Sequence, residues 1–200
     1  METKVVKSSA RKARGEERTL LDRNNWIETA MDVLATEGIG GLRVETLAKT
    51  CGVTKGSFYW HFKDRQDLLL AVLTYWRDGR IRDIEKQTTA PAGKELEQLY
   101  HVIEVYGSTR NRKGVAIEIA VRDWARRDPE AAAVIESVDI YRLDCTRKLF
   151  RACGLSEDEA RSRSLLLYAY VFGQSLMFYQ HFSDNLTELK RMIAERIVAA

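Results

Sequence analysis

The feature that most constrains this chain is its lack of strand signals and of helix-breaking prolines. Only two prolines occur in 200 residues, and no run of alternating Val, Ile or Thr is long enough to support a sheet. Apolar residues recur instead at the 3.6-residue spacing of amphipathic helices. The chain is 45% hydrophobic, which is enough to bury a sizeable core. The sequence therefore predicts an all-α protein of about nine helices.

Capping and turn residues set the expected helix boundaries. Gly38 ends the first helix, Gly52 can adopt the left-handed turn between two short helices, and Asp128 followed by Pro129 begins a long one. Ser156 and Glu159 have the spacing of a capping box. We expect helices over residues 19–37, 44–51, 55–61, 64–87, 94–109, 114–127, 129–153 and 156–182, and a last one from about residue 185.

The excess positive charge is confined to the N-terminal third. Residues 1–65 carry 12 Lys and Arg against 9 Asp and Glu, whereas residues 66–200 carry 20 of each. A basic segment of this kind suits a polyanion, either nucleic acid or an acidic membrane surface, although it can also be an ordinary solvated tail. Residues 1–18 are polar and rich in Ser, Lys and Arg, so we expect a disordered basic arm.

Several function classes are disfavoured by what the sequence lacks. No apolar run reaches the roughly 18 residues of a membrane span, and the first residues do not resemble a signal peptide, so we expect a cytoplasmic protein that does not bind membranes. The three cysteines form no C-x-x-C pair and the three histidines are scattered, so we expect reduced thiols, no metal and no cofactor. Because no catalytic motif is present, we do not expect an enzyme.

The stretch "CGVTKGSFYWHF", residues 51–62, mixes aromatic rings with polar groups. On a helix, Phe58 and Phe62 share one face, while Trp60 lies about 200° round from Phe58. We expect Phe58 and Phe62 to join Leu42, Leu47 and Val53 in a small core. The polar and amphipathic side chains of the stretch would then remain exposed. This arrangement matches a helix-turn-helix unit, although a plain two-helix turn in an all-α core is the alternative.

The longer segment "TLAKTCGVTKGSFYWHFKDRQDLLLAVL", residues 46–73, resembles the DNA-binding signature of the TetR family of bacterial transcriptional regulators. The family pattern is met at Ala48, Gly52, Val53, Tyr59, Phe62 and Leu68. The resemblance is close over about residues 19–73 and architectural beyond them. It implies a helix-turn-helix DNA-binding domain over residues 19–65, a larger helical effector-binding and dimerisation domain over residues 66–200, and a near-palindromic double-stranded DNA operator as partner.

The same resemblance assigns the DNA contacts. The matching positions are Thr54, Lys55, Ser57, Tyr59, Trp60, His61 and Lys63. Two positions depart from the family pattern. Arg43 stands where a Ser or Thr cap is common, so we expect a poor cap and an additional DNA contact. Arg65 stands where Lys is common and is still expected to hold a phosphate.

The segment "LLLYAYVFGQSLMFY", residues 165–179, is apolar nearly all the way round a helix. A second subunit is the simplest cover for such a helix, and a buried central helix in a monomer is the alternative. The last helix offers Leu186, Leu189, Met192, Ile193 and Ile197 at helical spacing. We therefore expect a homodimer through the last two helices, as in the TetR family.

Aromatic and aliphatic residues between these regions are candidates for an effector cavity, although plain core packing is the alternative for each of them. The candidates are Tyr100, Ile103, Tyr106, Ile117, Val121, Trp124, Tyr141, Phe172 and Leu176, with Trp76 beside them and His101, Glu104, Glu118 and Arg122 as polar candidates. The resemblance implies a repressor that a small apolar or aromatic effector releases from its operator, with the long helix after Arg65 carrying the displacement. A regulator without an effector and an activator stay open as alternatives.

Overall fold

The computed structural model describes residues 22–107 and 112–199, and every regular element in these ranges is helical. The predicted basic arm and the first residues of the predicted helix 19–37 lie outside the described residues. In chain order the elements are α1 (Arg23–Glu37), the short 3-10 helix η1 (Ile39–Gly41), α2 (Val44–Thr50), α3 (Lys55–Phe58), α4 (Arg65–Thr88), α5 (Glu95–Gly107), α6 (Arg112–Ala125), α7 (Pro129–Ala152), α8 (Glu157–Leu176) and α9 (Leu186–Val198). The all-α prediction is confirmed.

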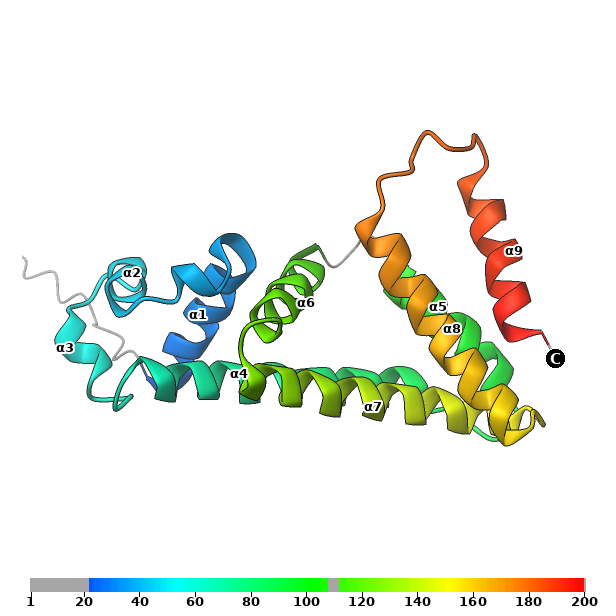
Figure 1. Ribbon diagram of the computed structural model, residues 1–200, viewed down its shortest axis with the longest axis horizontal. Helices are drawn as coiled ribbons and strands as arrows, with labels where there is room; N and C mark the ends of the chain where they lie inside the picture. Colours follow the sequence, from blue (N-terminus) through cyan, green and yellow to red (C-terminus); the bar gives the residue numbers. More distant parts are fainter. Residues whose placement is uncertain (1–21, 108–111, 200) are drawn as a thin grey trace, which may run out of the picture.

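Two long helices form the axis of the molecule. Helices α4 and α7 pack against each other and run along most of its length (Figure 1). Helices α1, α2 and α3 form a head at one end, while α5, α8 and α9 gather at the other. Helix α6 lies between the two groups and packs on both α1 and α7. The head is therefore connected to the rest of the chain through α4 and α6 together.

The predicted starts of α4, α8 and α9 carry side-chain caps, and of the capping box expected at Ser156 and Glu159 the bond to the Ser156 side chain is present. The side chains of Asp64, Ser156 and Asn185 each accept a hydrogen bond from the backbone N–H three residues later. These bonds satisfy N–H groups that have no partner within the helix. Gly52, at φ 68°, ends α2 as predicted, because the N–H of Val53 reaches Ala48 O and that of Gly52 reaches Lys49 O. This bond pair is the Schellman ending, which favours glycine.

Two predicted helices are shorter than expected. Helix α8 ends at Leu176 rather than near Phe182, and Met177 has extended backbone angles. Its last part gains little from packing within the chain, since Leu176, Met177 and Phe178 are exposed. Regular helix in α3 likewise ends at Phe58 rather than at residue 61, in a run of aromatic residues with low helix propensity. Its last turn is only partly regular, although the N–H of Phe62 still donates to Phe58 O over 3.0 Å.

The buried side chains form two cores. The first runs without interruption from Trp26, Phe58 and Phe62 in the head through α4 to α6 and α7, where Trp124 and Val138 belong to it. The second joins α5, α8, α9 and the end of α7. The domain boundary predicted at about residue 65 falls at the start of α4. Buried packing continues across it, so the head is not an isolated unit.

Candidate nucleic-acid interface and effector cavity

A small aromatic cluster fixes α3 to the head. Phe58 is fully buried, stacks on Phe62 with ring centroids 5.2 Å apart, and meets the edge of Trp26 at 5.4 Å. Leu42 and Leu47 are also fully buried in this core, and Val53 packs against it half-buried. The predicted packing of the two phenylalanines is confirmed. One side of α3 is therefore held rigidly, and its other side faces solvent.

Polar and aromatic groups are presented to solvent on α3 and on the residues just after it, up to Lys63. Trp60 is 87% exposed and Tyr59 62% exposed, although both follow directly on the buried Phe58. Thr54, Lys55 and Lys63 are exposed as well, while Ser57 and His61 are half-buried. The structure therefore brings the seven contacts implied between Thr54 and Lys63 to one region of the head. A tryptophan this exposed gains little from packing against the described residues.

Lys55 and Arg43 differ in how they are held near α2 and α3. The ammonium of Lys55 forms an ion pair with the carboxylate of Glu45 on α2, and this hydrogen bond holds the pKa of Glu45 below its usual value. Arg43 occupies the N-cap position of α2 and makes no side-chain capping bond, as expected of an arginine there. Thr54 is the N-cap of α3 and also makes no side-chain capping bond. These side chains are accordingly not committed to capping the helices.

Arg65 has a role that the sequence did not suggest. Its Nε donates to Leu42 O over 2.6 Å and its Nη2 to Ile39 O over 3.3 Å. These bonds connect the start of α4 to the segment that precedes α2. A guanidinium has five N–H donors, so Arg65 can still offer others to an external group. In this structure its established contacts position α2 relative to α4.

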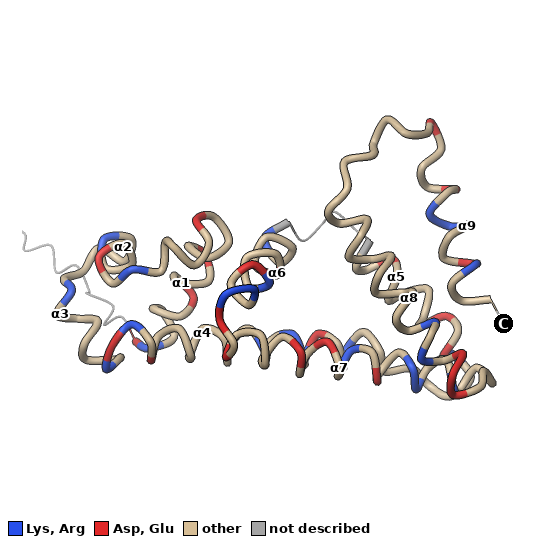
Figure 2. Tube along the Cα trace, viewed as in Figure 1, with Lys and Arg blue, Asp and Glu red and all other residues tan. Residues whose placement is uncertain are grey.

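Charge is unevenly arranged around the head. Basic residues lie near α2, on α3 and at the beginning of α4, with a few acidic residues among them (Figure 2). Arg23 is held at 3.2 Å from Asp67, whose other oxygen accepts the N–H of Lys63 over 3.0 Å. A surface with both basic and acidic side chains can form hydrogen bonds to particular groups as well as attract phosphates through its charge.

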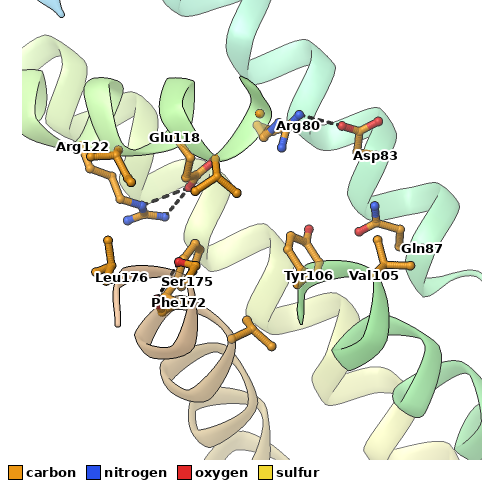
Figure 3. A pocket seen from close by; sticks show the side chains of 14 residues that line it. Arg80, Asp83, Gln87, Val105, Tyr106, Glu118, Arg122, Phe172, Ser175 and Leu176 are labelled. Atoms are coloured by element: carbon orange, nitrogen blue, oxygen red, sulfur yellow. Dashed lines mark hydrogen bonds and ion pairs between the residues drawn. The ribbon is translucent and has the colours of Figure 1, made fainter. Parts of the chain in front are cut away.

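A cavity of about 340 Å³ lies between α4, α5, α6 and α8, on the far side of α6 from the first core (Figure 3). Its polar lining comes mainly from α4 and α6, and its apolar lining mainly from α5, α6 and α8. The lining residues are Arg80, Asp83, Gln87, Val105, Tyr106, Gly114, Val115, Glu118, Ile119, Arg122, Val171, Phe172, Ser175 and Leu176. A volume of this order accommodates a small organic molecule.

The cavity contains some of the predicted effector residues and excludes others. Tyr106, Phe172 and Leu176 line it, as do the polar candidates Glu118 and Arg122. The other candidates do not line this cavity. Members of the first core are Ile117, Val121, Trp124 and Trp76, and Ile103 belongs to the second core. Tyr100 and Tyr141 pack half-buried against these cores, while His101 and Glu104 are exposed. The hydroxyl of Tyr141 donates to Glu85 on α4 instead.

The two-faced packing of α6 explains why Ile117, Val121 and Trp124 do not line the cavity. Helix α6 is apolar on two faces, and the face with Trp124 turns toward α1 and α7 while the face with Ile119 turns toward the cavity. Sequence spacing separates two such faces but does not say which one is covered. The missed lining residues Arg80, Asp83 and Gln87 recur on one face of α4 and look like a solvated stripe in the sequence. The only sequence feature that could have indicated a cavity there is the helical spacing of their charged and amide side chains.

A partly buried ion network forms one wall of the cavity. Glu118 Oε1 accepts from both Nε and Nη2 of Arg122, which also makes two hydrogen bonds to Asp139. Burial opposes the charge of Arg122, but its bonds to Asp139 and the charges of Glu118 and Asp139 outweigh this and raise its pKa. Arg142 is almost fully buried beside Glu118, and its Nε and Nη2 have no hydrogen-bond partner among the described residues. The guanidiniums of Arg122 and Arg142 lie 4.5 and 5.0 Å from the ring centroid of Phe172.

The far end of the molecule carries an exposed apolar surface. Its large side chains come from α8, from the connection to α9 and from α9 itself. They are Leu165, Leu166, Leu176, Met177, Phe178, Phe182 and Met192. Phe178 and Phe182 are 105% and 78% exposed, so they pack little against the described residues. Leu186, Leu189 and Ile193 are partly covered and line a second apolar hollow of about 430 Å³ between α8 and α9, whereas Ile197, expected on this surface, is buried in the second core.

Three further observations limit the chemistry of the described residues. Cys51, Cys145 and Cys153 are all free thiols. Within residues 22–107 and 112–199, no group of His, Cys, Asp or Glu is arranged to hold a metal ion. None of the helices described there is both long enough and apolar enough to cross a membrane.

Comparison with known proteins identifies the head. Residues 27–72 match the family model for bacterial regulatory proteins of the tetR family. Residues 27–72 therefore form a DNA-binding domain of the TetR family. The matched segment spans α1 to the first part of α4 and includes the aromatic cluster and the exposed side of α3. The predicted family is thereby confirmed.

Curated relatives agree over a region that includes this domain. The chain is 36% identical over 83 residues to the uncharacterised HTH-type regulator YuxN of Bacillus subtilis, covering 38% of this chain and 28% of that protein. It is 30% identical over 104 residues to the regulator AcrR of Shigella flexneri, covering 48% and 46%. A tetracycline repressor of Escherichia coli is 39% identical over 54 residues, covering 27% and 25%. The aligned regions thus span less than half of each relative's length.

Solved structures extend the likeness to the C-terminal helices. A protein from Saccharomonospora viridis, solved in complex with choline, matches 88% of this chain and 94% of its own with a TM-score of 0.70 at 16% identity. FadR of Bacillus subtilis, solved in complex with stearoyl-CoA, matches 87% and 96% with a TM-score of 0.60 at 19% identity. At such low identity the likeness establishes the fold alone. The two ligands differ greatly, so this fold does not by itself define a ligand class.

Proposed function

We propose that this TetR-family chain is a sequence-specific DNA-binding transcriptional repressor that acts in the cytoplasm as a homodimer and is released from its operator by a small molecule. The observation that carries the proposal is the exposed side of α3. Lys55 on α3 and Tyr59 and Trp60 just after it face solvent, and Phe58 and Phe62 hold this segment in place. A rigid short helix with polar and aromatic side chains can enter the major groove and contact base edges and phosphates.

The proposed DNA contacts are the residues at and after α3. Thr54, Ser57 and His61 would add hydroxyl and imidazole contacts, while Lys63 and Arg43 would reach the phosphate backbone. Arg65 positions α2 through its bonds to Leu42 and Ile39, and it would reach phosphate with its remaining donors. Because Lys55 is paired with Glu45 in the free protein, DNA binding would exchange that carboxylate for a phosphate.

The proposed dimer uses the apolar surface of α8 and α9. The exposed Phe178, Phe182 and Met177 support this, because large apolar side chains without cover favour association. An isologous contact of α8 and α9 with their copies would form a four-helix interface. Two heads related in this way would meet half-sites about 34 Å apart on a near-palindromic operator.

Effector release would pass through α6 and α4. Helix α6 contributes Glu118 and Ile119 to the cavity on one face and Trp124 to the core of the head on another. Near its start, Lys113 forms an ion pair with Asp32 on α1. A shift of α6 caused by an occupied cavity would therefore move α1 and change the spacing of the two α3 helices. The repressor sign of the proposal is supported by the tetracycline repressors among the relatives.

A gel-shift titration against the DNA that flanks the gene of this protein tests the proposal. We expect a shifted complex that survives excess unrelated DNA and weakens steeply as salt is raised. Binding that unrelated DNA competes away equally well would reject sequence-specific regulation. An assay that finds no DNA binding with folded, dimeric protein would reject the proposal as a whole.

A further inference from the structure

The charged groups that line the cavity already neutralise one another. Arg80 lies 2.9 Å from Asp83, and Arg122 lies 2.8 Å from Glu118, so the lining holds two positive and two negative charges. Asp139 and Arg142, which lie behind this wall, add one charge of each sign. Among the described lining residues every charge already has an opposite partner, so a ligand with a net charge would enter without a counter-charge there. Burying a charge without a partner is costly, so the cavity favours an uncharged ligand.

Gln87 lines the cavity, and its side chain makes no hydrogen bond to another described residue. Its Oε1 is buried and accepts no hydrogen bond from the described residues, while its backbone carbonyl accepts from Gln98. A carboxamide side chain offers one acceptor oxygen and two N–H donors. A buried amide left unpaired costs free energy that a ligand recovers when it supplies the matching donor and acceptor.

The rest of the cavity accepts an apolar body. Phe172 and Leu176 of α8 lie across the cavity from Gln87 and Asp83 of α4, with Tyr106 of α5 between the two sides (Figure 3). Burial raises the pKa of Tyr106, so its hydroxyl stays protonated and does not add a negative charge. The ring of Phe172 already faces the guanidiniums of Arg122 and Arg142, which leaves it poorly suited to hold a cationic ligand as well.

Resting on the proposed role of this cavity as the effector site, we propose that its effector is an uncharged amphiphile with a ring-sized apolar body and a carboxamide-like head group. The head group pairs with the side-chain amide of Gln87, giving an N–H to Oε1 and accepting from Nε2. The apolar body lies between Tyr106 and Phe172. Gln87 favours a head group that both donates and accepts a hydrogen bond. The paired charges of the cavity lining disfavour anionic acids and cationic amines.

Three probes with one apolar body and different head groups test the inference by calorimetry on the full-length protein. They are biphenylacetamide, biphenylacetate and biphenylethylamine, which are neutral, anionic and cationic near pH 7. We expect the amide to bind at least about tenfold more tightly than either charged probe, a discrimination typical of one paired polar group. Tighter binding of the acid or the amine would overturn the inference.

Variants at residue 87 separate recognition from folding. Gln87→Leu keeps the volume but removes the amide, and it should weaken binding of the amide probe about tenfold. Gln87→Glu places a carboxylate at the same point and should shift the preference to the amine. Gln66→Leu is the matched control, because Gln66 lies on the same helix, hydrogen-bonds Glu130 and does not line the cavity. It should leave the affinity of every probe unchanged.

The outcomes distinguish this inference from the proposed function. Unchanged amide binding in Gln87→Leu, with the thermal unfolding of both variants close to that of the parent, would overturn the role of Gln87. If no probe binds while the protein still shifts its operator, the ligand class is wrong and the DNA-binding function stands. If the amide binds with the expected selectivity but the protein binds no operator, the proposed function fails and the cavity assignment holds.

Discussion

Replacing Phe58 with Ala should destabilise the chain as a whole. Phe58 is fully buried, contacts Trp26 edge-on and stacks on Phe62, and its core continues through α4 into α6 and α7. Removing a buried phenylalanine costs about 3–5 kcal/mol through lost burial and the cavity left behind. Because one core connects the head to the long helices, this loss should lower a common unfolding transition.

The expected change is large enough to measure by calorimetry and circular dichroism. In a chain of about 150–250 residues each kcal/mol lowers the Tm by roughly 2–4 °C, so Phe58→Ala should lower it by roughly 6–20 °C. Trp60→Ala is the matched control, since Trp60 is adjacent to the same cluster but 87% exposed, and its stability should change by about 0.5 kcal/mol or less. A separate early transition for the head, with the main transition unmoved, would refute the shared core.

Two further substitutions test the caps and the connection to the effector cavity. Asp128→Ala removes the cap of α7 and the partner of Trp124 Nε1, so urea unfolding should report a loss of about 1–2 kcal/mol. Hydrogen bonds from Trp124 and the backbone hold the pKa of Asp128 below its ordinary 3.8. The stabilisation is therefore present above pH 3.8 and is lost as the pH falls through the pKa of Asp128 in the folded protein. An acid unfolding profile that is unchanged in the Ala variant would contradict this role of Asp128. Lys113→Met removes the ion pair with Asp32 and should change stability by about 1 kcal/mol or less, because both groups are exposed. It should nevertheless reduce the effect of a bound ligand on operator affinity, and an unchanged ligand effect would remove this ion pair from the pathway.

The head could be predicted from the sequence because its determinants are local. The four-residue spacing of Phe58 and Phe62, the glycine at residue 52 and the cap at Asp64 each act within a few residues of the chain. The all-α class follows for the same reason, since helices are stabilised by contacts between near neighbours. The family resemblance then supplied the function that these local features alone leave open.

The cavity was predicted less well because its determinants are not local. Trp124 and Val121 are as apolar as Ile119, and only the packing of α6 against α1 decides which residues face the core. In the sequence Gln87 looks like a solvent-exposed helix residue, and only the packing of α5 and α8 places it in the lining of a cavity. The early end of α8 has a related cause. Without covering contacts, the apolar residues after Leu176 do not continue the helix.

The salt dependence of operator affinity tests the central claim, that the exposed side of α3 binds DNA, most directly. Fluorescence anisotropy would compare the parent with Lys55→Ala, Tyr59→Ala and the control Lys148→Ala, whose side chain pairs with Asp144 on α7 away from the head. Loss of one phosphate contact reduces the slope of log affinity against log salt by about one, or about two when both subunits lose it. The account predicts this smaller slope for Lys55→Ala, weaker binding for Tyr59→Ala and no change for Lys148→Ala. Parent-like affinity and slope in both α3 variants, with their folding intact, would contradict it.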